Sequence, residues 1–191
     1  MENLVENISK SVAIELLFEE MPTRPTANAI FREARKIFGD INIINRDEND
    51  IEFSVDKFVA YNEDNTTSPV VLAMGNITDF DDKVAVSEFE RTQIWNVANS
   101  EELLSKYKYA LKIWDVNAQR QIPKERAIML VDWLNVALKL YPKCQAIWIK
   151  SAGKLQLAQS IKNLKETGIV KYLYSMVNIR FFNVPNTNEF I

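Results

Sequence analysis

Residues 107–168 read YKYALKIWDVNAQRQIPKERAIMLVDWLNVALKLYPKCQAIWIKSAGKLQLAQSIKNLKETG, and the rest of the chain is organised around them. The centre of this stretch predicts a long helix from Pro123 to Tyr141, because apolar residues recur there at steps of three and four. Pro123 suits the first turn of a helix, and Pro142 ends it because proline lacks the N–H that a further turn needs. Few residues between them are strongly polar, so we expect more than half of this helix to be covered.

Both flanks of the central helix predict strands. Lys108–Val116 alternates apolar and polar residues, and Cys144–Ile149 is a short apolar run. A strand, a crossover helix and a second strand of this length predict parallel pairing of the two strands. After a turn at Gly153, the apolar spacing predicts a further helix that is capped by Gly168.

The N-terminal half predicts a strand, a helix and then several short antiparallel strands. Ser11–Phe18 is strongly apolar, and Pro25–Phe38 carries an apolar stripe that ends at Gly39. The following strands are expected at Ile41–Ile44, Ile51–Val55, Phe58–Tyr61 and Pro69–Met74, with a tight hairpin at Asp56 and Lys57. Two further elements are a mostly helical segment at Val84–Leu104 and a last strand at Ser175–Val184.

These elements predict an α+β fold with a mixed, largely antiparallel sheet, packed helices and two docked α/β subdomains. We expect an acidic βαβββ subdomain with a linking helical segment over residues 1–103, and a basic βαβαβ subdomain over residues 104–191, docked as one compact unit. The first segment holds 21 acidic and 9 basic residues, net −12, and the second holds 5 acidic and 14 basic residues, net +9. Such opposed charges indicate internal docking, self-association into a homo-oligomer, or a face made for an acidic partner.

The composition indicates which class of protein this chain belongs to. The apolar fraction of 47% and the aromatic fraction of 10% are typical of a globular chain. The sequence has no apolar stretch long enough for a membrane span, and Met1–Lys10 lacks the pattern of a signal peptide, so we expect a cytoplasmic protein with no membrane partner. The single cysteine, Cys144, lies in an apolar run, which predicts a buried and unreactive thiol.

The chain contains no histidine. Nucleophile pairs of the Ser-His and Cys-His types, His-ligated zinc and histidine pH switches are therefore excluded. Asp79, Asp81 and Asp82 lack the glycine and the distant glutamate of a calcium loop, so we interpret them as a solvated acidic turn. We predict no catalytic residue, no metal and no cofactor, and an enzyme becomes the less favoured class of protein.

Four residues near the ends of the central strands form a candidate ligand or anion site: Asp115, Arg126, Ser151 and Lys154. Ligands gather beyond the C-terminal ends of parallel strands, where Asp115, Ser151 and Lys154 would converge. Arg126, on the first turn of the central helix, would either join them or serve local structure. The sequence around Gly153 lacks the first glycine and the final Ser or Thr of a Walker motif, so it does not predict a phosphate loop.

Several short segments carry a resemblance to a known family. They are SVAIELLFEEMP at 11–22, RTQIW at 91–95, the pair Trp114 and Asp115, LYPKCQAIWIKSAGK at 140–154 and VNIRFF at 177–182. In these segments the chain resembles a bacterial family, domain of unknown function 4261. The resemblance supports the fold and implies a bacterial origin, but it supplies no activity and no catalytic residues. Members of that family look longer beyond the NIRFF-like strand, which implies that this chain lacks a C-terminal segment able to complete a site.

The favoured function is a non-catalytic protein-interaction module of an accessory or immunity type, whose exposed carboxylates face a basic protein partner. The alternative is a small-ligand-binding protein, or an enzyme that works without histidine, with its site at the strand ends near Asp115 and Lys154. Binding of nucleic acid by the lysines of the second half ranks last, because arginine is scarce there and the acidic first half repels phosphates.

Overall fold

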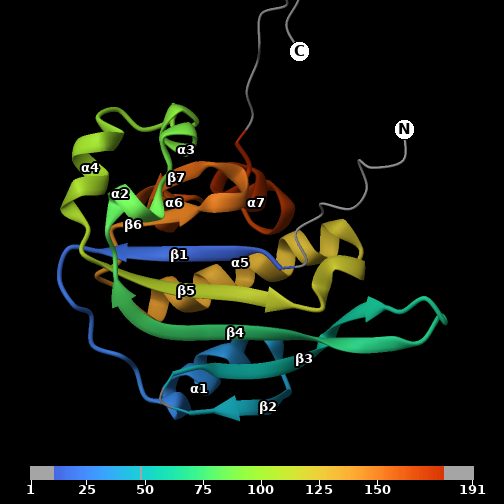
Figure 1. The fold of residues 1–191 in the computed structure, drawn as a ribbon. Coiled ribbons are helices and arrows are strands. Elements are labelled where there is room, and N and C mark those ends of the chain that lie inside the picture. Colours follow the sequence, from blue (N-terminus) through green and yellow to red (C-terminus); the bar gives the residue numbers. More distant parts are fainter. Residues whose placement is uncertain (1–10, 48, 179–191) are drawn as a thin grey trace, which may run out of the picture.

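A computed structural model describes residues 11–47 and 49–178, which form an α+β fold of one sheet with helices on both faces (Figure 1). The sheet has seven strands: β1 (Ala13–Phe18), β2 (Ile41–Arg46), β3 (Ile51–Tyr61), β4 (Thr67–Asp79), β5 (Tyr109–Val116), β6 (Ala146–Ile149) and β7 (Lys154–Leu157). The helices of the described residues are α1 (Ala27–Phe38), α2 (Asp82–Ala85), α3 (Glu88–Thr92), α4 (Ser100–Lys106), α5 (Pro123–Leu140), α6 (Ala158–Asn163) and α7 (Gly168–Met176). Two single turns of 3-10 helix are η1 (Ala118–Arg120) and η2 (Lys150–Ala152).

The strands lie in the order β2-β3-β4-β5-β1-β6-β7, and each neighbouring pair is antiparallel. The parallel pairing expected for the strands that flank α5 is therefore wrong. β5 and β6 run in the same direction, but β1 lies between them, so that Leu16 faces Leu111 of β5 on one side and Ile147 of β6 on the other. The inserted strand comes from far away in the sequence, and the local pattern of residues 107–168 carries no sign of it.

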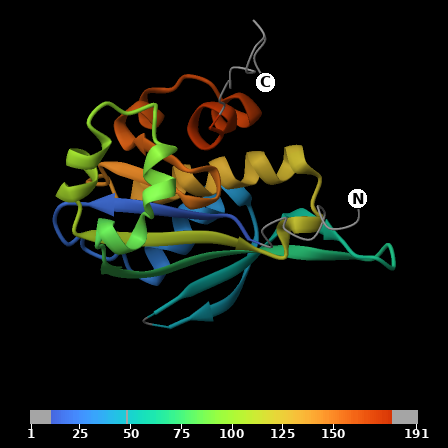
Figure 2. The ribbon, with the colours of Figure 1, turned by 45° about the horizontal axis from the view of Figure 1, so that its top comes forward.

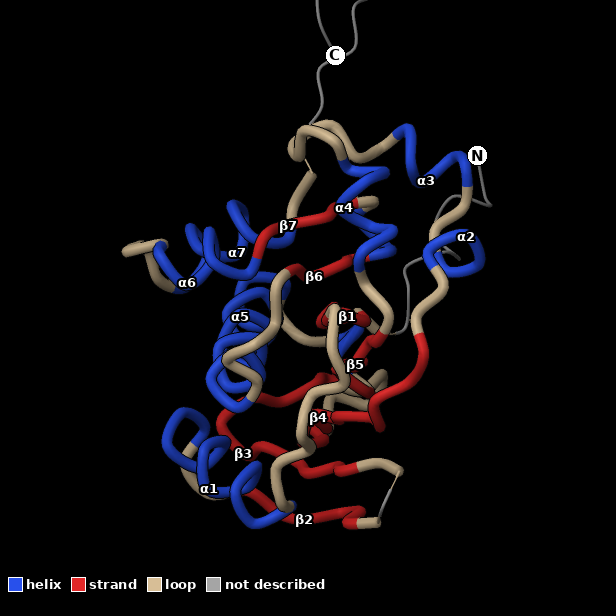
Figure 3. The backbone as a smooth tube through the Cα atoms, turned by 90° about the vertical axis from the view of Figure 1, so that its left-hand side faces the viewer, coloured by secondary structure: helices blue, strands red, loops and turns tan. Residues whose placement is uncertain are grey.

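The two faces of the sheet carry different helices (Figure 3). One face is covered by α1, α5, α6 and α7, which we call the back layer. The other face is covered over β6, β7 and β1 by residues 80–106, which contain α2, α3 and α4 and which we call the cap. The layers differ in charge: the back layer helices hold 8 basic and 3 acidic residues, net +5, and the cap holds 6 acidic and 3 basic residues, net −3.

The main core lies between the sheet and α5. Nine of the eighteen residues of α5 are buried and six more are half-buried, which confirms that the central helix is more than half covered. Trp133 is fully buried, its ring meets that of Phe53 edge to face with centroids 5.3 Å apart, and its indole N–H donates to the carbonyl of Ala73 at 3.2 Å. This hydrogen bond links α5 directly to β4.

Several elements begin and end where the sequence predicts. Thr26 precedes α1, where its hydroxyl accepts from the N–H of Ala29, and Gly39 follows α1 with a φ of +78° that favours glycine. The first strand, the central helix and the two strands beside it are confirmed. Within the mostly helical segment, α4 begins at Ser100 and is preceded by Asn99.

Two predicted elements of the sheet region differ from the structure. Asp56 and Lys57 make no hairpin, because β3 continues through them with a register shift between Val55 and Val59, and the long β3–β4 hairpin extends beyond the rest of the sheet (Figure 2). Lys154–Leu157 is the strand β7 rather than the start of a helix, because it pairs with β6 across the turn at Gly153.

The C-terminal part of the chain also differs from the prediction. Gly168 opens α7 instead of capping a helix, and α7 continues to Met176. The expected strand at Ser175–Val184 therefore begins inside a helix, and its part from residue 179 onward lies outside the described residues.

Candidate functional site

The ends of β5 and β6 reach the same edge of the sheet, and a hollow of about 560 Å³ lies beside them. Ser151 lines this hollow together with Val12, Tyr172 and Asn178. Ser151 is the only one of the four predicted site residues that does so. Burial raises the pKa of the Tyr172 phenol above its ordinary value, so its hydroxyl stays protonated and can donate to a bound group. The sequence reading missed Tyr172, whose only signal was the aromatic run of α7.

Asp115 and Arg126 form a buried ion pair rather than an open site, so that Arg126 takes the local structural role that was one of its two predicted alternatives. The Arg126 Nε donates to Asp115 Oδ2 at 2.6 Å, and Nη2 donates to Oδ1 at 3.1 Å. The same Oδ1 accepts from the backbone N–H of Val12 at 2.6 Å, and Asp115 is fully buried. Both carboxylate oxygens are thus occupied by the protein itself. The pair ties the end of β5 to the chain before β1 and to the first turn of α5, which is a structural role.

Lys154 lies away from Asp115, on the outermost strand of the sheet. Its ammonium donates to the carbonyls of Tyr174 at 2.6 Å and of Val177 at 2.7 Å, at the C-terminal end of α7. A cation is favourable there because the last carbonyls of a helix carry partial negative charge. Burial lowers the pKa of the ammonium below its ordinary value. The predicted convergence of Asp115, Ser151 and Lys154 is therefore not found. Asp115 is bound within its ion pair, Ser151 lines the hollow, and the turn at Gly153 carries Lys154 onto a different part of the surface.

Arg91 links the short helices of the cap to one another. From the sequence it was named only as part of the segment RTQIW. Arg91 donates from Nε to the carbonyl of Val86, and from Nη2 to the carbonyl and the carboxylate of Asp82 at 2.6 and 2.8 Å. Its Nη1 donates to Glu101 on α4 at 2.9 Å. One guanidinium therefore joins α2, α3 and α4. Arg126, in contrast, joins the first turn of α5 to the end of β5.

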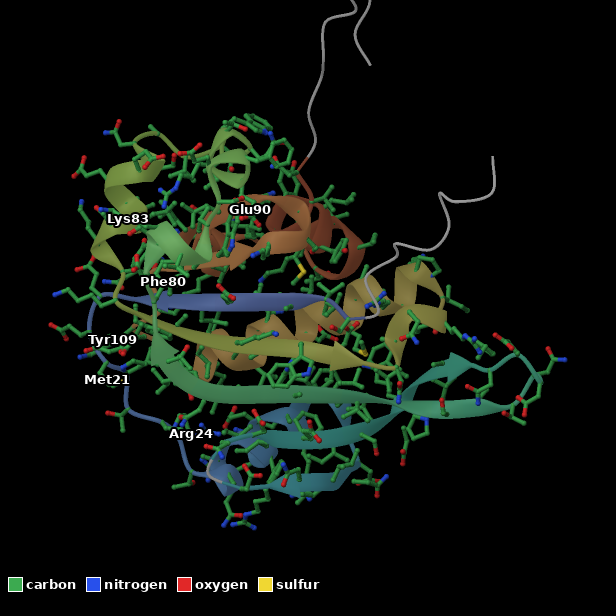
Figure 4. The ribbon with its side chains drawn as sticks, viewed as in Figure 1. Met21, Arg24, Phe80, Lys83, Glu90 and Tyr109 are labelled. Carbon is green, nitrogen blue, oxygen red and sulfur yellow. The ribbon has the colours of Figure 1, made fainter. Side chains whose placement is uncertain are left out.

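Large apolar side chains are exposed on the outside of the cap. Val84 is 81% exposed, Phe89 is 73% exposed and Trp95 is 61% exposed. The inner side of the same segment is buried, where Phe80, Val86 and Ile94 pack on Trp148 of β6. Figure 4 shows Lys83, Glu90 and Phe80 over this part of the sheet. The cap thus buries some of its apolar residues and exposes others to solvent.

The other candidate groups have structural roles. Asp81 accepts from the N–H of Lys83 and caps α2, while Asp82 binds Arg91, so the acidic turn stabilises the cap. Cys144 is buried, its thiol donates to the carbonyl of Ala146, and burial raises its pKa to about 12, as expected for an unreactive thiol. Within residues 11–47 and 49–178, no group of three or more carboxylates and thiols is placed to hold a metal ion.

Comparison with family models, curated proteins and solved structures finds no match for this chain. The resemblance to domain of unknown function 4261 therefore stays a prediction. None of the helices that the structure describes is long and apolar enough to cross a membrane.

Proposed function

We propose that the protein is a non-catalytic interaction module that binds a basic protein partner through the outer surface of the cap. The observation that carries the proposal is the exposure of Val84, Phe89 and Trp95 on a segment with a net charge of −3. An apolar group at the surface stays in contact with water until a partner covers it, and clustered exposed apolar residues are typical of interaction sites.

The chemistry of the cap suits a basic partner. Aromatic residues such as Phe89 and Trp95 supply much of the binding energy in protein interfaces. The surrounding carboxylates attract basic side chains, which speeds association and excludes acidic partners. The basic back layer lies on the opposite face of the sheet, so a basic protein approaches the cap side by preference. The contacts of Arg91 hold the three short helices in one arrangement, which lowers the ordering needed on binding.

The test is capture of a partner by the tagged chain from a lysate of the organism that encodes it, at low and at high salt. The informative variant is Phe89→Ser, and the matched control is Ile44→Ser, which removes a 55% exposed apolar side chain from β2 at the far edge of the sheet. We expect one stoichiometric partner to be captured by the wild type and by Ile44→Ser, and about tenfold less of it by Phe89→Ser. High salt should lower the capture in each case.

Equal capture by Phe89→Ser and the wild type would show that the cap is not the binding surface. Failure to capture any partner at low salt would contradict the proposed function as a whole.

A small-ligand function is the second candidate, and the hollow beside Ser151 and Tyr172 is the observation that favours it. The hydroxyls of these two residues would hold a polar group, while Val12 and Met176 would contact an apolar part. A metabolite that raises the melting temperature of the wild type and has no effect on Tyr172→Phe would support this function. A screen without any thermal shift would rule against it.

A further inference from the structure

Three lysines of the second half of the chain line one hollow of the back layer. Lys139 comes from the last turn of α5, Lys162 from the last turn of α6 and Lys171 from α7. Both α6 and α7 pack against α5, which brings these separate parts of the sequence together (Figure 3). The hollow has a volume of about 380 Å³, at the lower end of the range for small-molecule pockets. Its lining is Asn135, Leu138, Lys139, Pro142, Lys162 and Lys171.

The ammonium of Lys171 has no close anionic partner. Among the residues that the structure describes, it forms neither an ion pair nor a hydrogen bond. Burial lowers the pKa of Lys171 below its ordinary value, and attraction to the more distant carboxylate of Asp132 offsets only part of this effect. A nearby negative charge favours the charged form of a lysine. A bound anion would therefore supply the partner that Lys171 lacks.

The other two lysines are only partly neutralised. The Lys162 ammonium donates to the carbonyl of Pro142 at 2.9 Å, so the end of α5 presents an ammonium in place of a free carbonyl. Lys139 contacts Glu33 at 2.7 Å, but the same side chain also binds Lys36 at 2.6 Å. One carboxylate is thus shared between two ammonium groups, and positive charge remains at the hollow.

The charges around the hollow favour an anion with several negative groups. Four lysines, with Lys36 included, stand beside the two carboxylates of Glu33 and Asp132, which leaves a net charge of +2. The back layer helices carry +5 in all, and the acidic cap lies on the opposite face of the sheet, so anions approach the back layer by preference.

The types of side chain suit phosphate groups. A lysine ammonium binds phosphate as a point charge, and three of them from three helices can contact more than one phosphate group. The amide of Asn135 adds a further donor, while Leu138 and Pro142 offer apolar contact to the organic part of a ligand.

We propose that this hollow binds a small molecule that carries at least two phosphate groups, held by Lys139, Lys162 and Lys171. The binding site lies apart from the cap, and its lining shares no residue with that of the hollow beside Ser151. It is therefore a binding function in addition to the proposed one, and capture of a basic protein by the cap does not depend on it.

The test is isothermal titration calorimetry of the full chain with inorganic pyrophosphate, at low salt and without divalent cations. We expect pyrophosphate to bind, and orthophosphate to bind about tenfold more weakly, because a single phosphate group contacts fewer of the ammonium groups. Higher salt should weaken both, since the lysines are reached by solvent.

The informative variant is Lys171→Met, which keeps most of the apolar stem of the lysine and removes its charge. We expect it to weaken pyrophosphate binding about tenfold, because the lost contact joins two charged groups. Lys139→Met, at a side chain that is 64% exposed, should act in the same direction and keeps the test open if Lys171→Met fails to fold. The matched control is Lys124→Met, which removes the same charge from an exposed position on the first turn of α5 and should leave binding unchanged.

Three results would overturn the proposal. The first is no binding of pyrophosphate to the wild type at millimolar concentration. The second is an equal loss of affinity for Lys171→Met and Lys124→Met, which would mean that only the overall charge matters. The third is tighter binding of a thymidine octamer than of pyrophosphate, lowered equally by these two variants, which would make the back layer a nonspecific surface for nucleic acid.

Discussion

The two helical layers are attached to the sheet in different ways. The back layer packs on the sheet mainly through buried side chains, since α5 alone buries nine residues. Its arginine, Arg126, pairs with the fully buried carboxylate of Asp115. The helices of the cap are short, and Leu104 is the only buried residue within α2, α3 and α4. Its arginine, Arg91, binds helix carbonyls and carboxylates near the surface. The back layer therefore packs on the sheet through a long buried helix, whereas the cap packs through a few buried residues and leaves Val84, Phe89 and Trp95 exposed.

The largest expected effect comes from breaking the ion pair of the back layer. Asp115→Asn should lower the free energy of unfolding by about 2–4 kcal/mol, because Arg126 then keeps its charge without a partner in a site where its side chain is only 13% exposed. Urea denaturation followed by circular dichroism measures the change. The double variant Asp115→Asn with Arg126→Met should recover at least half of the loss, because no unpaired charge remains.

An unchanged midpoint for Asp115→Asn would contradict a structural role of the pair. The residue would then have to be reconsidered as part of a ligand site at the strand ends.

A smaller and local effect is expected from the arginine of the cap. Arg91→Ala should destabilise the cap by about 1–2 kcal/mol, since it removes several hydrogen bonds whose acceptors are partly reached by water. Hydrogen exchange should become faster for the amides of α2, α3 and α4 and stay unchanged in α5. The control is Lys106→Ala, whose ion pair with Glu102 is exposed and should contribute less than about 0.5 kcal/mol.

Faster exchange throughout the molecule after Arg91→Ala would show that the cap and the sheet unfold together. The two layers would then differ in their residues but not in their local stability.

The sequence could predict the elements with a long local pattern, but not those that depend on contacts between distant residues. The central helix was predictable, because its apolar residues recur along its whole length between two prolines. The position of β1 between β5 and β6 was not, since strand order depends on contacts between residues that lie far apart in the chain. β7 was missed because four residues after Gly153 carry no periodicity that separates a strand from the first turn of a helix.

The candidate site shows the same limit. The sequence placed Asp115, Arg126 and Ser151 near the strand ends correctly, because each follows or precedes a predictable element. It could not show that Val12 and Arg126 occupy the carboxylate of Asp115, or that Lys154 binds the end of α7. Both contacts depend on elements that are distant in sequence. The exposed side of the cap was equally hidden, because Phe89 and Trp95 are indistinguishable by type from core residues.

The smallest expected effect comes from replacing the two buried tryptophans, Trp133 and Trp148, which lie on opposite faces of the sheet. Trp133 donates to the carbonyl of Ala73, whereas the indole N–H of Trp148, under the cap, has no acceptor among the described residues. Trp148→Phe removes a buried unpaired donor, which offsets part of the lost apolar contact, so the change in unfolding free energy should stay below about 1 kcal/mol. Trp133→Phe leaves a buried carbonyl without its donor and should cost about 2 kcal/mol more in the same urea titration. Equal losses for the two variants would mean that the N–H of Trp148 has a partner in solution, and that the cap is as closely specified as the back layer.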